Sequence, residues 1–193
     1  MSGRSPAEWV SYLLEPKNWI IATTLAVGWH AGGAAGLGWG AVAALFAGVL
    51  PMAFISRGVR RGRWDDRYVG AKRPRLIVLG FIIASVATGL ALLAGFGAPH
   101  ELTGYIGCML ASVALLAAIT TVWKISIHCA VAAGSVTMLT LLFGLWLAPA
   151  YLLVALTGWS RVALTDHTAA QVIAGSLLGA AAAVVTYAVI SHQ

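Results

Sequence analysis

Two histidines lie close to hydroxyl and cationic side chains at spacings that allow chemistry. His128 follows Lys124 and Ser126 in the segment Lys-Ile-Ser-Ile-His, and His167 comes six residues after Arg161 in Ser-Arg-(five residues)-His. An imidazole can act as a nucleophile or as a general acid near neutral pH, and a neighbouring cation can hold an anion beside it. The two segments therefore predict an anion-binding site that contains two imidazoles.

Gln171 lies four residues after His167, so the two side chains fall on one face of a helix. The amide oxygen can accept a hydrogen bond from one ring nitrogen and leave the other nitrogen facing a substrate. This pairing predicts that His167 is a nucleophile with an orienting partner.

The elements that must position these segments are membrane helices. The 193 residues are 60% hydrophobic and 9% charged, which excludes a soluble domain of ordinary composition. The apolar runs predict an all-α, polytopic membrane helical bundle with six or seven transmembrane helices. The expected spans are 19–36, 39–55, 76–96, 102–123, 127–145, 147–159 and 168–190, after a short amphipathic helix over 7–14. We expect an N-terminal interfacial segment over 1–17 and a single transmembrane domain over 18–193.

Alternation of the spans across the membrane places every Lys and Arg on one face. These residues are Arg4, Lys17, Arg57, Arg60, Arg61, Arg63, Arg67, Lys72, Arg73, Arg75, Lys124 and Arg161. The positive-inside rule predicts that this face is cytoplasmic, and a bacterial plasma membrane is the expected location. The segments that carry His128 and His167 emerge on the same face, so we expect them to meet there.

At these residues the chain resembles the type 2 phosphatidic acid phosphatase superfamily, over roughly residues 65–190. The family motifs are Lys-(six residues)-Arg-Pro, Pro-Ser-Gly-His and Ser-Arg-(five residues)-His-(three residues)-Asp. Ser160, Arg161 and His167 match the third motif in identity and spacing, and Ser126 and His128 keep two residues of the second.

The first family motif is matched only in part. Arg73 and Pro74 are present, but the residue seven before Arg73 is Asp66, and the nearest cation, Arg67, is one position too close.

The resemblance implies a role for each matching residue. His167 would attack phosphorus to form a phosphohistidine, and His128 would protonate the leaving lipid oxygen. The groups expected around the phosphate are Arg161, Arg73 with Arg67 or Lys72, Ser126, Ser160 and Lys124. No metal or other cofactor is implied, because cations and helix dipoles supply the charge stabilisation.

Gln171 stands where the family has Asp. A carboxylate both fixes the tautomer of the nucleophilic ring and stabilises the charge that develops on it, whereas an amide does only the first. Asp166 is expected to cap the following helix rather than replace that carboxylate. The sequence thus predicts a metal-independent lipid phosphate phosphatase and permits a slow one.

The expected substrate is a polyprenyl or glycerolipid phosphate or diphosphate, with membrane lipids as the other partners. Nucleic acid is not an expected partner, and a homodimer through small-residue helix faces stays open. One alternative is a non-catalytic lipid-phosphate-binding membrane protein, which Gln171 permits. A second is a magnesium-dependent prenyltransferase suggested by Asp65 and Asp66, although a second Asp cluster is missing from the sequence.

Overall fold

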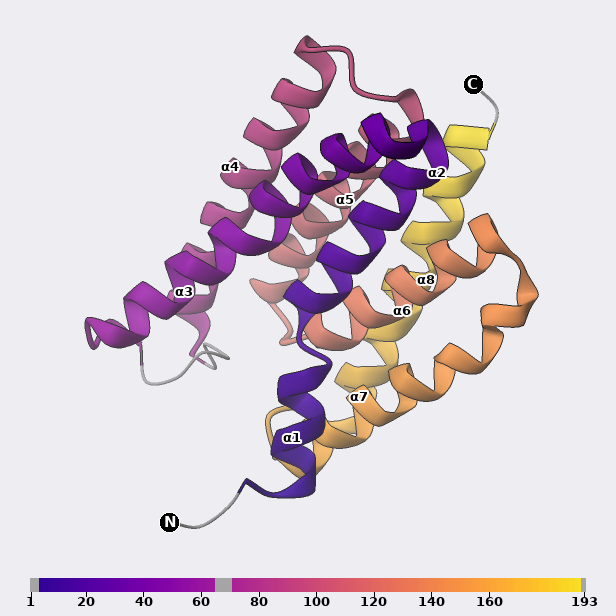
Figure 1. The fold of residues 1–193 in the computed structure, drawn as a ribbon. Coiled ribbons are helices and arrows are strands. Elements are labelled where there is room, and N and C mark those ends of the chain that lie inside the picture. The colour runs from indigo at the N-terminus through magenta and orange to yellow at the C-terminus, as the bar shows by residue number, and fades with distance from the viewer. Residues whose placement is uncertain (1–3, 65–70, 192–193) are drawn as a thin grey trace.

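The computed structural model describes residues 4–64 and 71–191, and the regular elements in these ranges are helices (Figure 1). They are α1 (Pro6–Leu13), α2 (Pro16–Ala44), the π-helical turn η1 (Leu45–Val49), α3 (Leu50–Arg60), α4 (Lys72–Gly95), α5 (His100–Thr120), α6 (Ile127–Phe143), the 3-10 helix η2 (Leu145–Ala150), α7 (Tyr151–Ala163) and α8 (Ala169–Ser191). No strand occurs among the described residues, so the predicted all-α fold is confirmed.

The first two predicted spans form a helical hairpin that bends inside α2. Gly32 and Gly33 leave the helical conformation, and Gly33 has φ 56° and ψ −135°, which residues with a Cβ rarely adopt. The two legs then pack backbone to backbone, since a Cβ on Gly28 would lie 2.4 Å from the carbonyl oxygen of Gly36. In Figure 1 one leg rises from α1 and the other returns toward α3. The turn therefore comes a few residues before the predicted boundary.

The returning leg continues through η1 into α3. Pro51 has no N–H, and in a regular α-helix its ring would meet the carbonyl of residue 47. The wider π-helical turn over Leu45–Val49 comes immediately before the proline and removes this conflict. The second leg can therefore run as a continuous helical segment to Arg60.

The helices α6 and α8 approach one another through glycines. A Cβ on Gly175 would lie 2.5 Å from the carbonyl oxygen of Ser126, and one on Gly179 would lie 1.9 Å from that of Ala130. No side chain fits at these distances, so the two backbones are in direct contact. This contact brings the first turns of α6 and α8 together.

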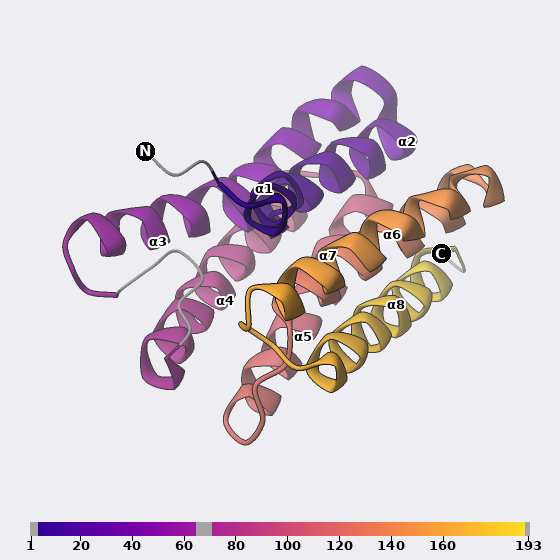
Figure 2. The same ribbon diagram turned by 90° about the horizontal axis from the view of Figure 1, so that it is seen from below.

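The N-terminal helix α1 packs on α7. The capping box of Ser5 and Glu8 starts α1, as expected for a short amphipathic helix over 7–14. Figure 2, seen from the side that carries α1, shows α7 between α1 and α8. The predicted sixth span divides into η2, which contains Pro149, and α7.

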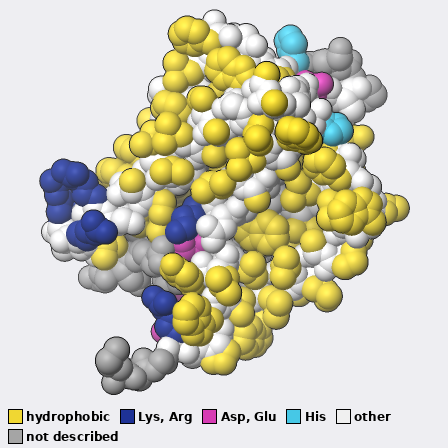
Figure 3. Space-filling view, in the orientation of Figure 1, with side chains coloured by type: hydrophobic (Ala, Val, Ile, Leu, Met, Phe, Trp, Pro, Cys, Tyr) yellow, Lys and Arg dark blue, Asp and Glu magenta, His cyan; other side chains and the backbone are white. Residues whose placement is uncertain are grey.

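The protein has the surface of an integral membrane protein. Five helical runs among the described residues are long and apolar enough to cross a membrane, and the first, Pro6–Arg60, contains the hairpin. Apolar side chains such as Leu152, Leu177 and Val185 point outward, as lipid contact requires. In Figure 3 hydrophobic atoms cover most of the visible face, and the Lys and Arg side chains gather toward its lower left.

Candidate active site

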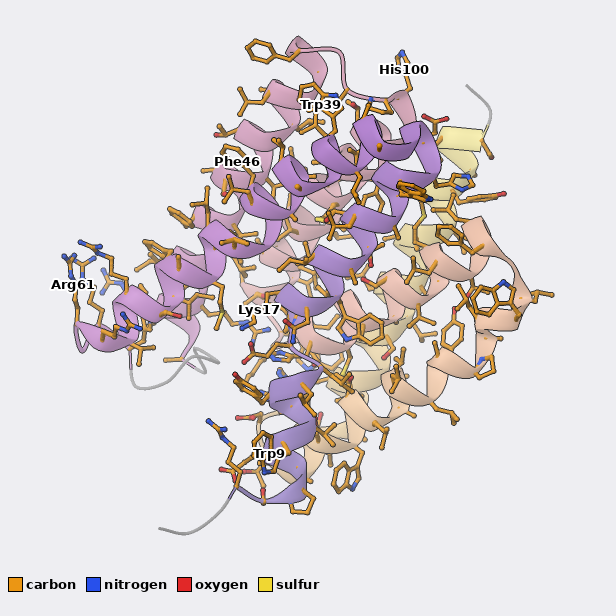
Figure 4. All side chains as sticks on the ribbon, viewed as in Figure 1. Trp9, Lys17, Trp39, Phe46, Arg61 and His100 are labelled. Atoms are coloured by element: carbon orange, nitrogen blue, oxygen red, sulfur yellow. The ribbon has the colours of Figure 1, made fainter. Side chains whose placement is uncertain are left out.

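Three connections meet at the end of the bundle that carries α1. The backbone N–H of Ser126 donates to the carbonyl of Gln171 at 3.2 Å, and Lys124 Nζ donates to the carbonyl of Asp166 at 2.7 Å. A short hydrogen bond joins the guanidinium of Arg75 to the carbonyl of Ile125. The start of α4, the connection before α6 and the connection before α8 are therefore held together by direct hydrogen bonds. Figure 4 shows Lys17 near this end and His100 at the opposite end.

Gln171 orients the His167 ring and caps α8 at the same time. Its Oε1 accepts the backbone N–H of Thr168 at 3.1 Å, and Thr168 Oγ1 accepts the backbone N–H of Gln171 at 3.4 Å, which is a capping box. The same Oε1 lies 3.2 Å from His167 Nδ1. Because a backbone N–H can only donate, the amide must present its oxygen here, and Nδ1 must then carry the ring proton. Nε2 is then left without a proton, with its lone pair available.

The environment of His167 keeps its ring neutral. The side chain is 8% exposed, and its pKa is lowered from 6.5 to about 4. Burial is the largest cause, because desolvation disfavours the imidazolium form. The positive charges of Lys124, Arg75 and Arg161 act in the same direction, and the hydrogen bond to Gln171 opposes them. A neutral ring is the form that can attack phosphorus.

Arg161 is fixed by one partner from the N-terminal helix and one from the connection that follows α7. Its side chain is 1% exposed, with Nη1 donating to Ser11 Oγ at 2.6 Å and Nη2 at 2.7 Å from Asp166 Oδ2. The expectation that Asp166 caps α8 is therefore wrong, because Thr168 takes that position and the carboxylate pairs with Arg161. The guanidinium is therefore held through both of its terminal nitrogens.

Ser126 and His128 start α6 on the other side of the site. Ser126 is the N-cap residue, and its Oγ accepts the backbone N–H of Cys129 at 3.4 Å. Its side chain is fully buried. His128 lies in the first turn of α6, where the unpaired N–H groups of the helix produce a positive potential.

A cavity of about 170 Å³ joins these groups, and we call it the site cavity. Its polar end is lined by Glu15, Lys17, Arg75, His128, Arg161 and His167. The remaining wall is apolar and comes from α2, η1, α3, α4, α5 and α6, with Ile20, Ile82, Met109 and Val131 among its residues. The cavity therefore joins two imidazoles and two guanidinium groups to an apolar wall.

The predicted phosphate-binding residues are distributed unevenly around this cavity. Arg73 is exposed and does not line it, and Ser160 Oγ donates to the carbonyl of Thr157 at 2.8 Å. Lys124 does not line the cavity, and its Nζ donates to the carbonyl of Asp166, the residue before His167. Arg67 and the side chain of Lys72 lie outside the described residues.

Sequence reasoning missed three residues that the structure places at the site. Arg75 replaces Arg73 on the cavity wall, is 5% exposed, and its Nε has no hydrogen-bond partner among the described residues. Its position as the last cation before a long apolar run was the available signal. Glu15 precedes a Pro-Lys pair at the start of the first apolar run, and nothing in the sequence marks Ser11.

Comparison with known proteins agrees with the motifs. Residues 111–193 match the PAP2 superfamily, which confirms the superfamily predicted from the sequence. The match includes both histidine segments, and it supports phosphatase activity on phosphate esters. No curated protein and no solved structure matches the chain.

The ring of His167 should titrate with a midpoint near pH 4 when followed by NMR in protein with isotopically labelled histidine. Because its pKa is lowered on folding, the stability linked to the neutral ring is complete above about pH 6.5. This stability decreases as the pH falls from there toward 4. Lys124→Gln should raise the midpoint by removing a nearby positive charge, and Arg61→Gln, an exposed cation, is the control. A midpoint near 6.5 in the unaltered protein would contradict this account.

Proposed function

We propose that the protein hydrolyses a lipid phosphate or diphosphate at the membrane interface through a phosphohistidine on His167. The observation that carries this proposal is that His128, His167, Arg75 and Arg161, from four separate segments, line one cavity. The superfamily match supports the reaction class. We expect the reaction to need no metal, because the cations and the first turn of α6 supply positive charge.

In the proposed first step, His167 Nε2 forms a bond to phosphorus while the bond from phosphorus to the leaving oxygen breaks. His128 gives its proton to that oxygen, which leaves as the alcohol from a monoester or as the lipid phosphate from a diphosphate. In the second step water attacks the phosphohistidine, His128 takes the proton of the water, and inorganic phosphate leaves. Both imidazoles then return to their starting forms.

Arg75 and Arg161 are the groups that we assign to the phosphate oxygens. Both side chains are buried at the polar end of the cavity, where a charge-assisted hydrogen bond to phosphate is strong. Arg161 is anchored through Ser11 and Asp166, so it needs little rearrangement. The backbone N–H groups that follow Ser126 add the positive potential of a helix N-terminus.

The apolar wall of the cavity favours a lipid over a water-soluble phosphate ester. The polar end of the site and the apolar residues of α2, α4, α5 and α6 belong to the same cavity. A substrate with an anionic head and an apolar tail can therefore contact both regions. Polyprenyl and glycerolipid phosphates both meet this description.

Purified protein in detergent with a chelator should release inorganic phosphate from at least one of farnesyl phosphate, farnesyl diphosphate and dioleoyl phosphatidate. His167→Ala should abolish release, since it removes the nitrogen that we propose attacks phosphorus. His128→Ala should lower kcat by about 10²-fold to 10⁴-fold through loss of the general acid. Quenching with labelled substrate should yield an acid-labile phosphoprotein that His167→Ala lacks.

The same assay tests the alternative of a non-catalytic lipid-phosphate binder, which the amide at Gln171 favours. A folded protein that binds these lipids and releases no phosphate from any of them would overturn the enzymatic proposal. Release of inorganic phosphate only with added magnesium would instead support a metal-dependent phosphatase. Magnesium-dependent release of diphosphate from farnesyl diphosphate would support the prenyltransferase alternative.

Arg75→Gln and Arg73→Gln form a matched pair that tests the assignment of the phosphate-binding cation. Arg75→Gln should lower kcat/KM about 10²-fold, because a buried donor to the transition-state charge is lost. Arg73→Gln should change kcat/KM by no more than about threefold, since this side chain is exposed. The reverse order of effects would show that the Arg-Pro pair of the first motif holds the phosphate.

We also propose that the site faces the cytoplasm of a bacterial plasma membrane. The Lys and Arg side chains visible in Figure 3 gather toward the end that carries α1 and the tip of α3, which supports the positive-inside assignment. The test uses single-cysteine variants in a protein from which Cys108 and Cys129 have been removed. The introduced thiol of Arg60→Cys should not react with a membrane-impermeant thiol reagent in intact cells. The introduced thiol of Glu101→Cys should react. Labelling of Arg60→Cys instead would show that the orientation is the reverse of the one proposed.

A further inference from the structure

The site cavity contains a carboxylate that the reaction described above does not use. Glu15 lines its polar end, its side chain is 4% exposed, and Oε2 lies 3.2 Å from Lys17 Nζ. Glu15 is the N-cap residue of α2, but its side chain makes no capping hydrogen bond. The corner between α1 and α2 thus directs this side chain to the cavity instead of to the helix end.

The two imidazoles of the cavity must carry different charges. His167 has to be neutral to attack phosphorus, and His128 has to be protonated to give a proton to the leaving oxygen. Burial and nearby cations favour the neutral form of His167, and His128 lines the same cavity as the two guanidinium groups. The lowered pKa of His167 shows the strength of that effect in this cavity. His128 therefore needs a negative charge that His167 does not.

The charged and titratable groups around His128 come from every side of the cavity. They are Glu15 and Lys17 at the start of α2, Arg75 on α4, Arg161 on α7, Lys124 before α6 and His167 before α8. The described parts of α5 and α8 contribute no charged residue to the cavity wall. Glu15 is thus the acidic residue of the lining.

The other described carboxylates are placed elsewhere. Glu8 belongs to the capping box of α1, and Asp166 pairs with Arg161 at 2.7 Å. Glu101 lies in the first turn of α5, next to His100 at the opposite end of the bundle (Figure 4). Among the residues that the structure describes, Glu15 alone is placed to supply negative charge inside the cavity.

We propose that Glu15 is a positioning residue that holds His128 in its protonated, proton-donating form during hydrolysis. This inference rests on the proposed function and extends the site to the start of α2, which lies outside the region that matches the superfamily. The carboxylate does not touch the reacting atoms and acts through the imidazolium. Glu15 thus provides a negative charge for His128. Gln171, the partner of His167, is uncharged and provides none.

The test is the pH dependence of kcat/KM for whichever of the three lipid probes the unaltered protein hydrolyses fastest. Glu15→Gln should move the basic limb to lower pH by about one unit, because an opposite charge nearby raises the pKa of an imidazolium. The acidic limb should stay in place, and Glu15→Asp should restore most of the shift. Lys17→Gln should move the basic limb in the opposite direction, and Glu101→Gln is the matched control that leaves the profile unchanged.

A second measurement does not depend on turnover. NMR titration of the His128 ring in labelled full-length protein should give a lower midpoint in Glu15→Gln than in the unaltered protein. Equal midpoints, or a loss of kcat with both limbs unmoved, would overturn the role of Glu15. Absence of hydrolysis by the unaltered protein would refute the proposed function, whereas the titration would still decide whether Glu15 controls His128.

Discussion

The contact between the backbones of α6 and α8 is the constraint on which the site depends. Gly175 and Gly179 bring α8 against the carbonyls of Ser126 and Ala130, so the first turns of the two helices lie side by side. At this distance the N–H of Ser126 reaches the carbonyl of Gln171. Two imidazoles from segments about forty residues apart in the chain then line one cavity as a result of helix packing.

Gln171 shows how an amide can serve at a position where the family has a carboxylate. One oxygen accepts the helix N–H of Thr168 and faces His167 Nδ1, so helix capping and ring orientation use the same atom. The carboxylate of Asp166 forms an ion pair with Arg161. Burial first, and the charges of Lys124, Arg75 and Arg161 second, then lower the pKa of His167 to about 4.

The local part of this arrangement could be predicted from the sequence, and the long-range part could not. Helical spacing predicted that His167 and Gln171 share a face, because residues four apart always do. The sequence could not indicate that Arg75 rather than Arg73 lines the cavity. Residues two apart on a helix differ by about 200° in direction, and no local pattern shows which of them faces inward. The hydrogen bond between Arg161 and Ser11 joins residues 150 positions apart, and no sequence periodicity indicates such a contact.

The helix α1 has two surfaces with separate requirements. Trp9 and Leu13 are exposed on its outer side, where Arg4 lies 5.2 Å from the Trp9 ring centre, and Ser11 on its inner side holds the guanidinium of Arg161. The sequence of α1 is therefore constrained by more than its amphipathic pattern. A replacement segment in evolution or in a chimaera that preserved hydrophobicity, but had no hydroxyl at this inward position, would remove one partner of the buried guanidinium.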